Sequence, residues 1–185
     1  MKRQVYHVKI EKEEAPGFLH RFLMGSYDMM STIASSIVAV MFVLVFFFRV
    51  ANVVGSSMEP TLQNDDRIII TNATTAYEFG DIVVIYRQDD VSIIKRVIGV
   101  EGDVVDIDFD TGDVFVNGEV LSEDYILEPT HRSFTDGPEF PLTVPEGTVF
   151  VLGDNRNNSL DSRSGEIGLV DTNSIVGKMI FEIGN

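Results

Sequence analysis

The hydrophobic and polar positions first separate an uncharged stretch from a charged one. No charged residue occurs from Met29 to Phe48, and the second half, Val38 to Phe48, is wholly apolar. Twenty residues at about 1.5 Å each cover roughly the 30 Å of a bilayer core. The hydroxyls in the first half, such as Thr32 and Ser35, can bond carbonyls of their own helix. The pattern predicts a transmembrane helix over residues 29–48.

The flanking charges indicate which way this helix crosses the membrane. Five Lys or Arg residues precede the span, whereas after Arg49 the next basic residue is Arg67. Basic residues accumulate on the cytoplasmic side, so we expect residues 1–28 to be a cytoplasmic tail and residues 49–185 an extracytoplasmic domain. A cleaved signal peptide fits less well, because the leading tail is long, the apolar run exceeds a usual signal core and no clear small-x-small site follows.

Beyond Arg67 the pattern becomes that of β-strands, with short β-branched runs bounded by turn residues. Asn117-Gly118 is a strong hairpin signal, and the proline-rich stretch 129–145 is typical of an irregular excursion. No long helical period and no internal repeat is present. The fold class predicted is mainly β, one antiparallel sheet domain behind one N-terminal transmembrane helix. The predicted strands cover residues 67–71, 81–86, 91–94, 105–109, 114–116, 148–152 and 175–183.

The composition excludes several kinds of partner and active site. The chain has 185 residues, a formal net charge of -15 and no cysteine. A nucleic-acid partner is not expected, because phosphate binding needs clustered Lys and Arg. Without cysteine there is no disulfide, no thiolate zinc site and no cysteine nucleophile. We expect neither a metal nor a cofactor.

The turn-prone stretch 55–62, close behind the apolar run, offers a candidate nucleophile in Ser57. Most such stretches are plain loops, and serine is a weak nucleophile unless a base lies beside it. His131 is the one histidine after the apolar run, but it has no recognisable partner and fits a surface loop. A lysine can serve instead where burial lowers its pKa.

Two lysines follow the apolar run, Lys95 and Lys178. Lys95 is the better candidate, because it ends the apolar strand that contains Ile93 and Ile94. The alternative interpretation is that Lys95 is an ordinary lysine at the end of a strand, with its amine in water. Lys178 is a weaker rival that we expect to face solvent. The polar stretch 153–163 is either a solvated turn or a support that orients a neutral lysine.

Four segments together resemble the bacterial type I signal peptidases, the membrane-bound serine proteases that remove signal peptides. They occur in the family's order behind an N-terminal span, and relatives from the endoplasmic reticulum and archaea carry histidine where this chain has Lys95. One departure is Gly55, where some members have a serine whose hydroxyl helps to bind the oxyanion, so the second donor is open. The compact middle region suggests a reduced second β subdomain. The segments are 57–62, 80–84, 95–99 and 153–163.

The resemblance implies roles for individual residues. Ser57 would be the nucleophile, Lys95 the general base, and Ser159 would bond the lysine amine. The substrate would add as a strand between the Ser57 segment and the Lys95 strand, with small side chains at the first and third positions before the cut. Residues expected to support the site are Arg96, Asp154, Asp161 and Arg163. Residues expected either to line substrate pockets or to be plain β core are Val53, Met58, Leu62, Ile68, Val84, Ile93 and Ile94.

The expected partners are signal-peptide-bearing precursors, the lipid bilayer and the secretion machinery, and the expected location is the plasma membrane. Ser57 lies nine positions after Phe48, within about 30 Å of the end of the span even when extended. Two alternatives remain: a repressor-type self-cleaving Ser-Lys protease, and a membrane-anchored β domain that binds partners without catalysis. Cleavage of a precursor by wild type and by serine or lysine variants separates them.

Overall fold

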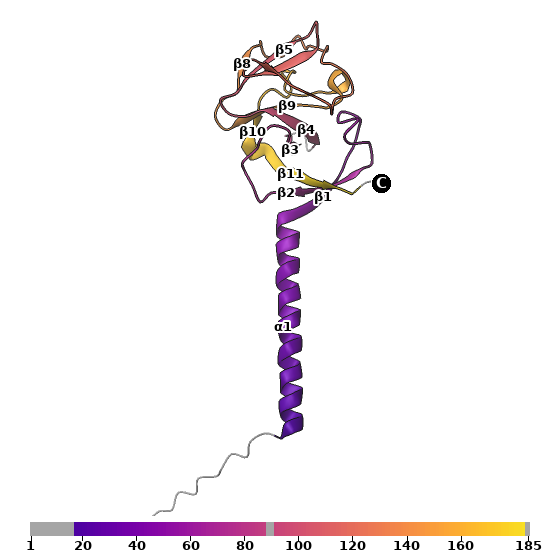
Figure 1. The fold of residues 1–185 in the computed structure, drawn as a ribbon, viewed down its shortest axis with the longest axis vertical. Coiled ribbons are helices and arrows are strands. Elements are labelled where there is room, and N and C mark those ends of the chain that lie inside the picture. Colours follow the sequence, from indigo (N-terminus) through magenta and orange to yellow (C-terminus); the bar gives the residue numbers. More distant parts are fainter. Residues whose placement is uncertain (1–16, 88–90, 184–185) are drawn as a thin grey trace, which may run out of the picture. The chain divides into compact units, whose positions relative to one another are not determined.

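The computed structural model describes residues 17–87 and 91–183. The chain forms two compact units, Met1–Leu44 and Val45–Asn185. The first contains most of one long helix, and the second is a β domain (Figure 1).

Helix α1 runs from Phe18 to Phe47. Its segment Phe22–Phe47 is long and apolar enough to cross a membrane, with a mean hydropathy of 2.3. The helix begins earlier than the predicted span, and Phe48 belongs to the first strand instead. Of the predicted tail, residues 1–16 lie outside the described residues.

Hydroxyl groups along α1 bond back to its own carbonyls, as the sequence suggested. Thr32 Oγ1 donates to Asp28 O at 2.8 Å, and Ser36 Oγ donates to Thr32 O at 2.8 Å. Ser35 Oγ donates to Ser31 O at the same distance. The polar side chains therefore leave no unsatisfied hydroxyl at these positions, which is the condition for placing them in lipid.

The larger sheet has seven strands in the order β1-β2-β11-β3-β4-β9-β10, and every neighbouring pair is antiparallel. The C-terminal strand β11 inserts between β2 and β3, so the end of the chain completes the middle of the sheet (Figure 1). The strands are β1 (Phe48–Asn52), β2 (Arg67–Thr71), β3 (Ile82–Tyr86), β4 (Ser92–Gly99), β9 (Thr148–Leu152), β10 (Val170–Asp171) and β11 (Ile175–Glu182).

The smaller sheet has the order β7-β6-β5-β8 and lies beyond β9, away from β1 and β2 (Figure 1). Asn117 and Gly118 join β6 to β7 with φ values of 55° and 82°, the two positive angles that a tight hairpin requires. A shared core packs Ile98 and Phe150 of the larger sheet against Val105 of the smaller one. The strands are β5 (Val104–Asp108), β6 (Asp113–Val116), β7 (Glu119–Val120) and β8 (Leu142–Thr143).

The predicted fold class, a mainly antiparallel β domain behind one long apolar helix, is confirmed. Strands missed by the sequence are β1, which continues the apolar run without a break, and the two-residue strands β7, β8 and β10. β4 continues to Gly99 instead of ending at residue 94. This extension places Lys95 inside a strand rather than at its end.

One half of β4 has an open edge that matters for the site. β3 pairs with β4 from Ser92 to Arg96, but β9 pairs with it only from Arg96 onward. Within the described ranges, no strand therefore lies on the second edge of the half that begins at Ser92. Such an edge offers backbone groups to an added strand.

Candidate active site

The turn that carries Ser57 is held by its own backbone and by a neighbouring amide. Leu62 N donates to Met58 O at 2.9 Å, and Gly55 N donates to Asn64 Oδ1 at 2.8 Å. Gly55 has a φ of 93°, a conformation that side-chain-bearing residues rarely adopt. The turn leaves Ser57 half-buried at the wall of a cleft.

Lys95 reaches this serine from the neighbouring strand. Its Nζ lies 2.8 Å from Ser57 Oγ and 2.9 Å from Ile94 O. The side chain is buried, with 3% of its surface exposed. In the described part of the chain, no carboxylate forms an ion pair with its amine. A hydroxyl and a carbonyl are thus its only polar partners there.

This environment lowers the pKa of Lys95 from an ordinary 10.5 to about 8. Burial is the main cause, because it penalises the charged ammonium form. Asp161 and Asp154 act in the opposite direction, and the positive charge of Arg163 adds to the lowering. A neutral fraction of Lys95 is therefore available near pH 8 to accept a proton from the Ser57 hydroxyl.

Arg96, the next residue on β4, ties the strand to the serine turn. Its Nε and Nη2 bond the two carboxylate oxygens of Asp154 at 2.8 and 2.6 Å. Thr61 Oγ1, from the serine turn, donates to the same carboxylate at 2.5 Å. Asp154 is fully buried, and this bidentate pair supplies the partners that a buried charge needs. The pair joins the turn, β4 and the loop after β9.

Asp161 and Arg163 form a second buried pair within that loop. Arg163 Nε donates to Asp161 Oδ1 at 2.8 Å, and Gly153 N donates to Asp161 Oδ2 at 3.1 Å. Arg163 Nη1 also donates to the carbonyl of Arg132 at 3.0 Å. The pair therefore closes the loop on itself and fixes it to the irregular excursion.

Ser159 does not make the bond that the resemblance implied. Its hydroxyl is buried and has no hydrogen-bond partner among the described residues. It packs instead against Gly153, where an added Cβ would overlap both Ser159 Oγ and the carbonyl oxygen of Ser57. Glycine at this position allows the loop to lie directly on the backbone of Ser57.

Sequence reasoning missed a third buried pair, between Arg156 and Glu123. Arg156 is completely buried and bonds Glu123 Oε2 at 2.8 Å and Thr130 Oγ1 at 3.0 Å through Nη1. Tyr125 donates its hydroxyl to Glu123 at 2.8 Å, and Arg96 lies 4.1 Å from the centre of its ring. The one sequence signal was the position of Arg156 inside the polar stretch 153–163.

The cleft beside Ser57 and Lys95 has a volume of about 230 Å³. Five of the seven expected pocket residues line it, together with Ala51, Val54 and Val91. Leu62 and Ile68 do not line it, because both are fully buried in the core cluster under it. The five that line it are Val53, Met58, Val84, Ile93 and Ile94.

The two rival bases lie elsewhere. His131 is exposed, and its Nδ1 lies 3.1 Å from the carbonyl of Phe109. Lys178 does not simply face solvent, since it forms an ion pair with Asp81 at 2.7 Å. Neither residue lines the cleft.

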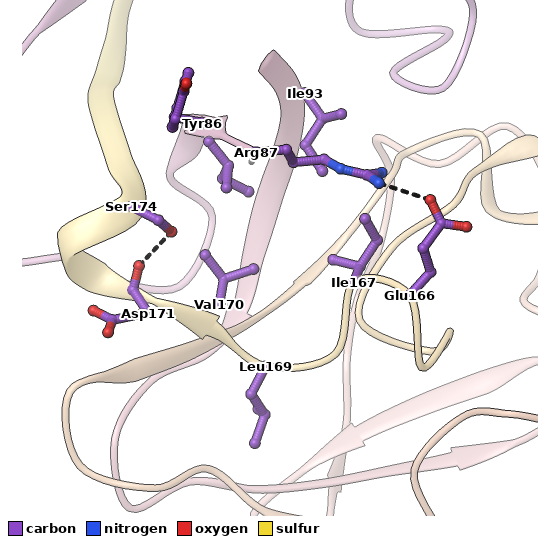
Figure 2. Close-up of a pocket in the computed structure, with 10 residues that line it drawn as sticks. Tyr86, Arg87, Ile93, Glu166, Ile167, Leu169, Val170, Asp171 and Ser174 are labelled. Atoms are coloured by element: carbon purple, nitrogen blue, oxygen red, sulfur yellow. Dashed lines mark hydrogen bonds and ion pairs between the residues drawn. The ribbon is translucent and has the colours of Figure 1, made fainter. Parts of the chain in front are cut away.

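A second cavity, of about 420 Å³, lies between β10, the end of β3 and Ile93 (Figure 2). Arg87 Nη2 bonds Glu166 Oε1 at 2.7 Å at one end, and Ser174 Oγ donates to the Asp171 carbonyl at 2.6 Å at the other. Its serine thus bonds a carbonyl, so the cavity lacks a hydroxyl–amine contact like that of Ser57 with Lys95 in the first cleft. Among the described residues, no group of three or more His, Asp or Glu is placed to hold a metal.

Comparison with known proteins gives a consistent family. A family model described as signal peptidase, peptidase S26, matches residues 26–183. Signal peptidase I S of Bacillus subtilis (strain 168) is 38% identical over 159 residues, covering 80% of this chain and 84% of that protein. Signal peptidase I of Bacillus licheniformis is 34% identical over 164 residues, covering 84% of this chain and 87% of that protein. A solved signal peptidase I from Enterococcus faecalis V583 is 31% identical, has a TM-score of 0.45, and covers 57% of this chain and 97% of that one.

Proposed function

From the premise that this chain belongs to the signal peptidase family, peptidase S26, we propose how its own residues carry out the reaction. The activity is that of a signal peptidase I, a serine peptidase that removes signal peptides from secreted precursors.

Ser57 is the nucleophile and Lys95 the general base. The neutral Lys95 amine takes the proton of the Ser57 hydroxyl as Oγ attacks the carbonyl carbon of the scissile peptide bond. The resulting ammonium gives a proton to the leaving amine, and the signal peptide remains as an ester on Ser57. Lys95 then takes a proton from the water molecule that attacks this ester and gives it to Ser57 Oγ as the ester bond breaks, which releases the signal peptide and restores the free serine and neutral lysine. The supporting observation is the 2.8 Å separation of Nζ and Oγ in a buried setting that lowers the lysine pKa.

The precursor adds as an extended strand along the open edge of β4, beside the segment that precedes Ser57. This edge is free of β9 before Arg96, and the cleft that follows it is lined by aliphatic side chains. Backbone bonds along a strand are independent of sequence, whereas the aliphatic walls of a cleft of about 230 Å³ favour small side chains over large ones. This arrangement favours cleavage after a small-x-small motif.

Helix α1 anchors the chain in the plasma membrane, with the N-terminus in the cytoplasm and residues 49–185 outside. The support is the apolar segment Phe22–Phe47 and the excess of basic residues before it. Precursors emerge from the secretion machinery at this outer surface, which makes that machinery the expected neighbour. Residues 1–28, which end at Asp28 and include the first turns of α1, are then the cytoplasmic tail, and the uncharged stretch from Met29 crosses the lipid.

The test is cleavage of a precursor with a small-x-small site by the full chain reconstituted in lipid vesicles. Ser57→Ala should abolish cleavage, because without the Ser57 hydroxyl the site has no nucleophile. The adjacent Ser56→Ala should retain at least about a third of wild-type activity. Sequencing the product's N-terminus locates the cut. Persistent cleavage by Ser57→Ala would exclude the proposed nucleophile, and cleavage of the enzyme alone would favour the self-cleaving alternative.

A further inference from the structure

The peptide bond between Ser56 and Ser57 carries the Ser56 carbonyl and the Ser57 N–H, which point in opposite directions. In a trans peptide the C=O and N–H point to opposite sides of one rigid plane, and among the described residues only two X-Pro bonds are cis. Whatever holds the Ser56 carbonyl therefore also aims the Ser57 N–H. In the described ranges, no acceptor bonds this N–H, which leaves it for a substrate oxygen.

The Ser56 carbonyl accepts two hydrogen bonds, one from Glu59 N within the turn at 3.2 Å and one from outside the turn, from Asn155. The side-chain Nδ2 of Asn155 donates to Ser56 O at 3.0 Å, and its backbone N donates to Ser57 O at 3.1 Å. Two consecutive carbonyls of the nucleophile's backbone are thus bound by one residue. Asn155 is 5% exposed, so water does not compete freely for the amide.

We propose that Asn155 is a positioning residue that aims the Ser57 N–H at the oxyanion of the tetrahedral intermediate. Gly55 has no side chain to offer a second donor, so the backbone amide of Ser57 carries more of the charge stabilisation. An oxyanion donor is effective only when its direction is fixed before the charge develops. The Asn155 side chain adds the shorter of the two bonds that provide this fixation, from the side of the peptide plane opposite to the substrate.

The loop that carries Asn155 does not depend on this contact for its position. Arg96 and Asp154 fasten it before Asn155, and Arg163 and Asp161 fasten it afterwards. The Asn155 backbone bond to Ser57 O is also independent of the side chain. Loss of the side-chain amide should therefore leave the Ser56 carbonyl with the longer bond from Glu59 N alone, which loosens one peptide plane while the loop stays in place.

Asn158 provides a matched control on the same loop. Its Nδ2 donates to the hydroxyl of Ser56 at 2.9 Å rather than to the carbonyl, and the residue is exposed. Asn155→Ala and Asn158→Ala remove the same chemical group from the same serine's surroundings. The first change removes a hydrogen bond that holds the peptide plane, and the second does not.

The experiment measures precursor cleavage by the full chain in vesicles, with kcat and KM separated, and inhibition by a peptide aldehyde. We expect Asn155→Ala to lower kcat roughly 10- to 100-fold with KM within about twofold, part of the loss typical of a deleted oxyanion donor. Asn158→Ala should lose less than about threefold. Asn155→Leu, which fills the vacated volume, should match Asn155→Ala.

The aldehyde separates positioning from general damage. Its adduct with Ser57 carries the oxyanion, whereas the matching peptide alcohol forms no adduct. For Asn155→Ala and Asn155→Leu the aldehyde should bind more weakly by the factor lost in kcat, the alcohol should bind as before, and the pH at half-maximal activity should not move. Equal losses in both asparagine variants, a loss confined to KM, or unchanged aldehyde affinity would each overturn the inference.

This inference rests on Ser57 being the nucleophile, and the two can fail separately. If Ser57→Ala still cleaves, the proposed reaction fails. If Ser57→Ala is inactive and both Asn155 variants keep wild-type kcat, only the role of Asn155 fails.

Discussion

Lys95 on β4 and Lys178 on β11 form a natural comparison, because both align with Val83 of β3, one on either side. Lys178 keeps 28% of its side chain exposed and pairs with Asp81 at 2.7 Å. Lys95 is 3% exposed, and its amine meets the Ser57 hydroxyl and the Ile94 carbonyl. Equivalent positions in one sheet thus place Lys178 in an ion pair and leave Lys95 with no ion-paired carboxylate among residues 17–87 and 91–183.

The difference shows what prepares a lysine for proton transfer. A strand position brings the amine near a hydroxyl, but burial without a paired carboxylate is what lowers the pKa of Lys95 to about 8. Arg96, the next residue on β4, shows the effect of a paired carboxylate on a buried cation. Burial acts to lower its pKa too, but its hydrogen bonds and charge pairing with Asp154 outweigh that effect, and the pKa is raised.

The largest expected effect is on catalysis. Lys95→Ala should lower kcat/KM by about 10³-fold or more, in the upper range for loss of a general base, and Lys178→Ala by less than about threefold. Both are measured by precursor cleavage in vesicles. If the two variants lose activity equally, the position of a lysine in the sheet rather than its burial decides its function, and the contrast between Lys95 and Lys178 is wrong.

A smaller effect is the pH dependence of wild type. Below pH 8 the ammonium form of Lys95 dominates, so kcat/KM should fall about tenfold for each pH unit, and above pH 8 it should level off. Lys178→Ala should leave this midpoint in place. An acid limb centred near the ordinary lysine pKa of 10.5 would mean that burial does not control the amine.

Stability should show a cost of burying Lys95. Its folded pKa of about 8 lies below the ordinary 10.5, so the unfolded chain binds more protons between these values and stability rises with pH across that window. Below pH 8 the full cost is present, at most about 3 kcal/mol from the difference of 2.5. Lys95→Met should therefore raise Tm at pH 7 by removing up to that amount, with the gain fading towards pH 10.5. Calorimetry in detergent micelles measures it, and a lowered Tm at pH 7 would contradict the assignment.

The smallest effect belongs to Lys178. A partly exposed pair contributes about 0–1 kcal/mol, so Lys178→Ala should change the free energy of unfolding by no more than that. The same calorimetry, compared at low and high salt, measures the change. A loss as large as several kcal/mol would show that the pair with Asp81 behaves as a buried one.

Some elements and residues could be predicted because the physics is local. The runs at β2, β3 and β9 are β-branched and bounded by turns, and Asn117-Gly118 demands the hairpin that forms. β10 could not be predicted, because a two-residue strand has no period of its own and exists through its pairing with β9. β1 was not predicted for a different reason, because its first residues continue the apolar helical run without a signal that ends the helix.

The sequence by itself determined a long apolar helix, an antiparallel β domain, and the serine and lysine most suited to a dyad. Each of these depends on side-chain type and spacing within short segments. Only the tertiary structure decided that Lys95 is buried with its amine on a hydroxyl and a carbonyl, that Leu62 and Ile68 are core, and that Asn155 donates to the Ser56 carbonyl. These properties arise where segments distant in sequence meet, and the electrostatic cost of a charge depends on everything that surrounds it.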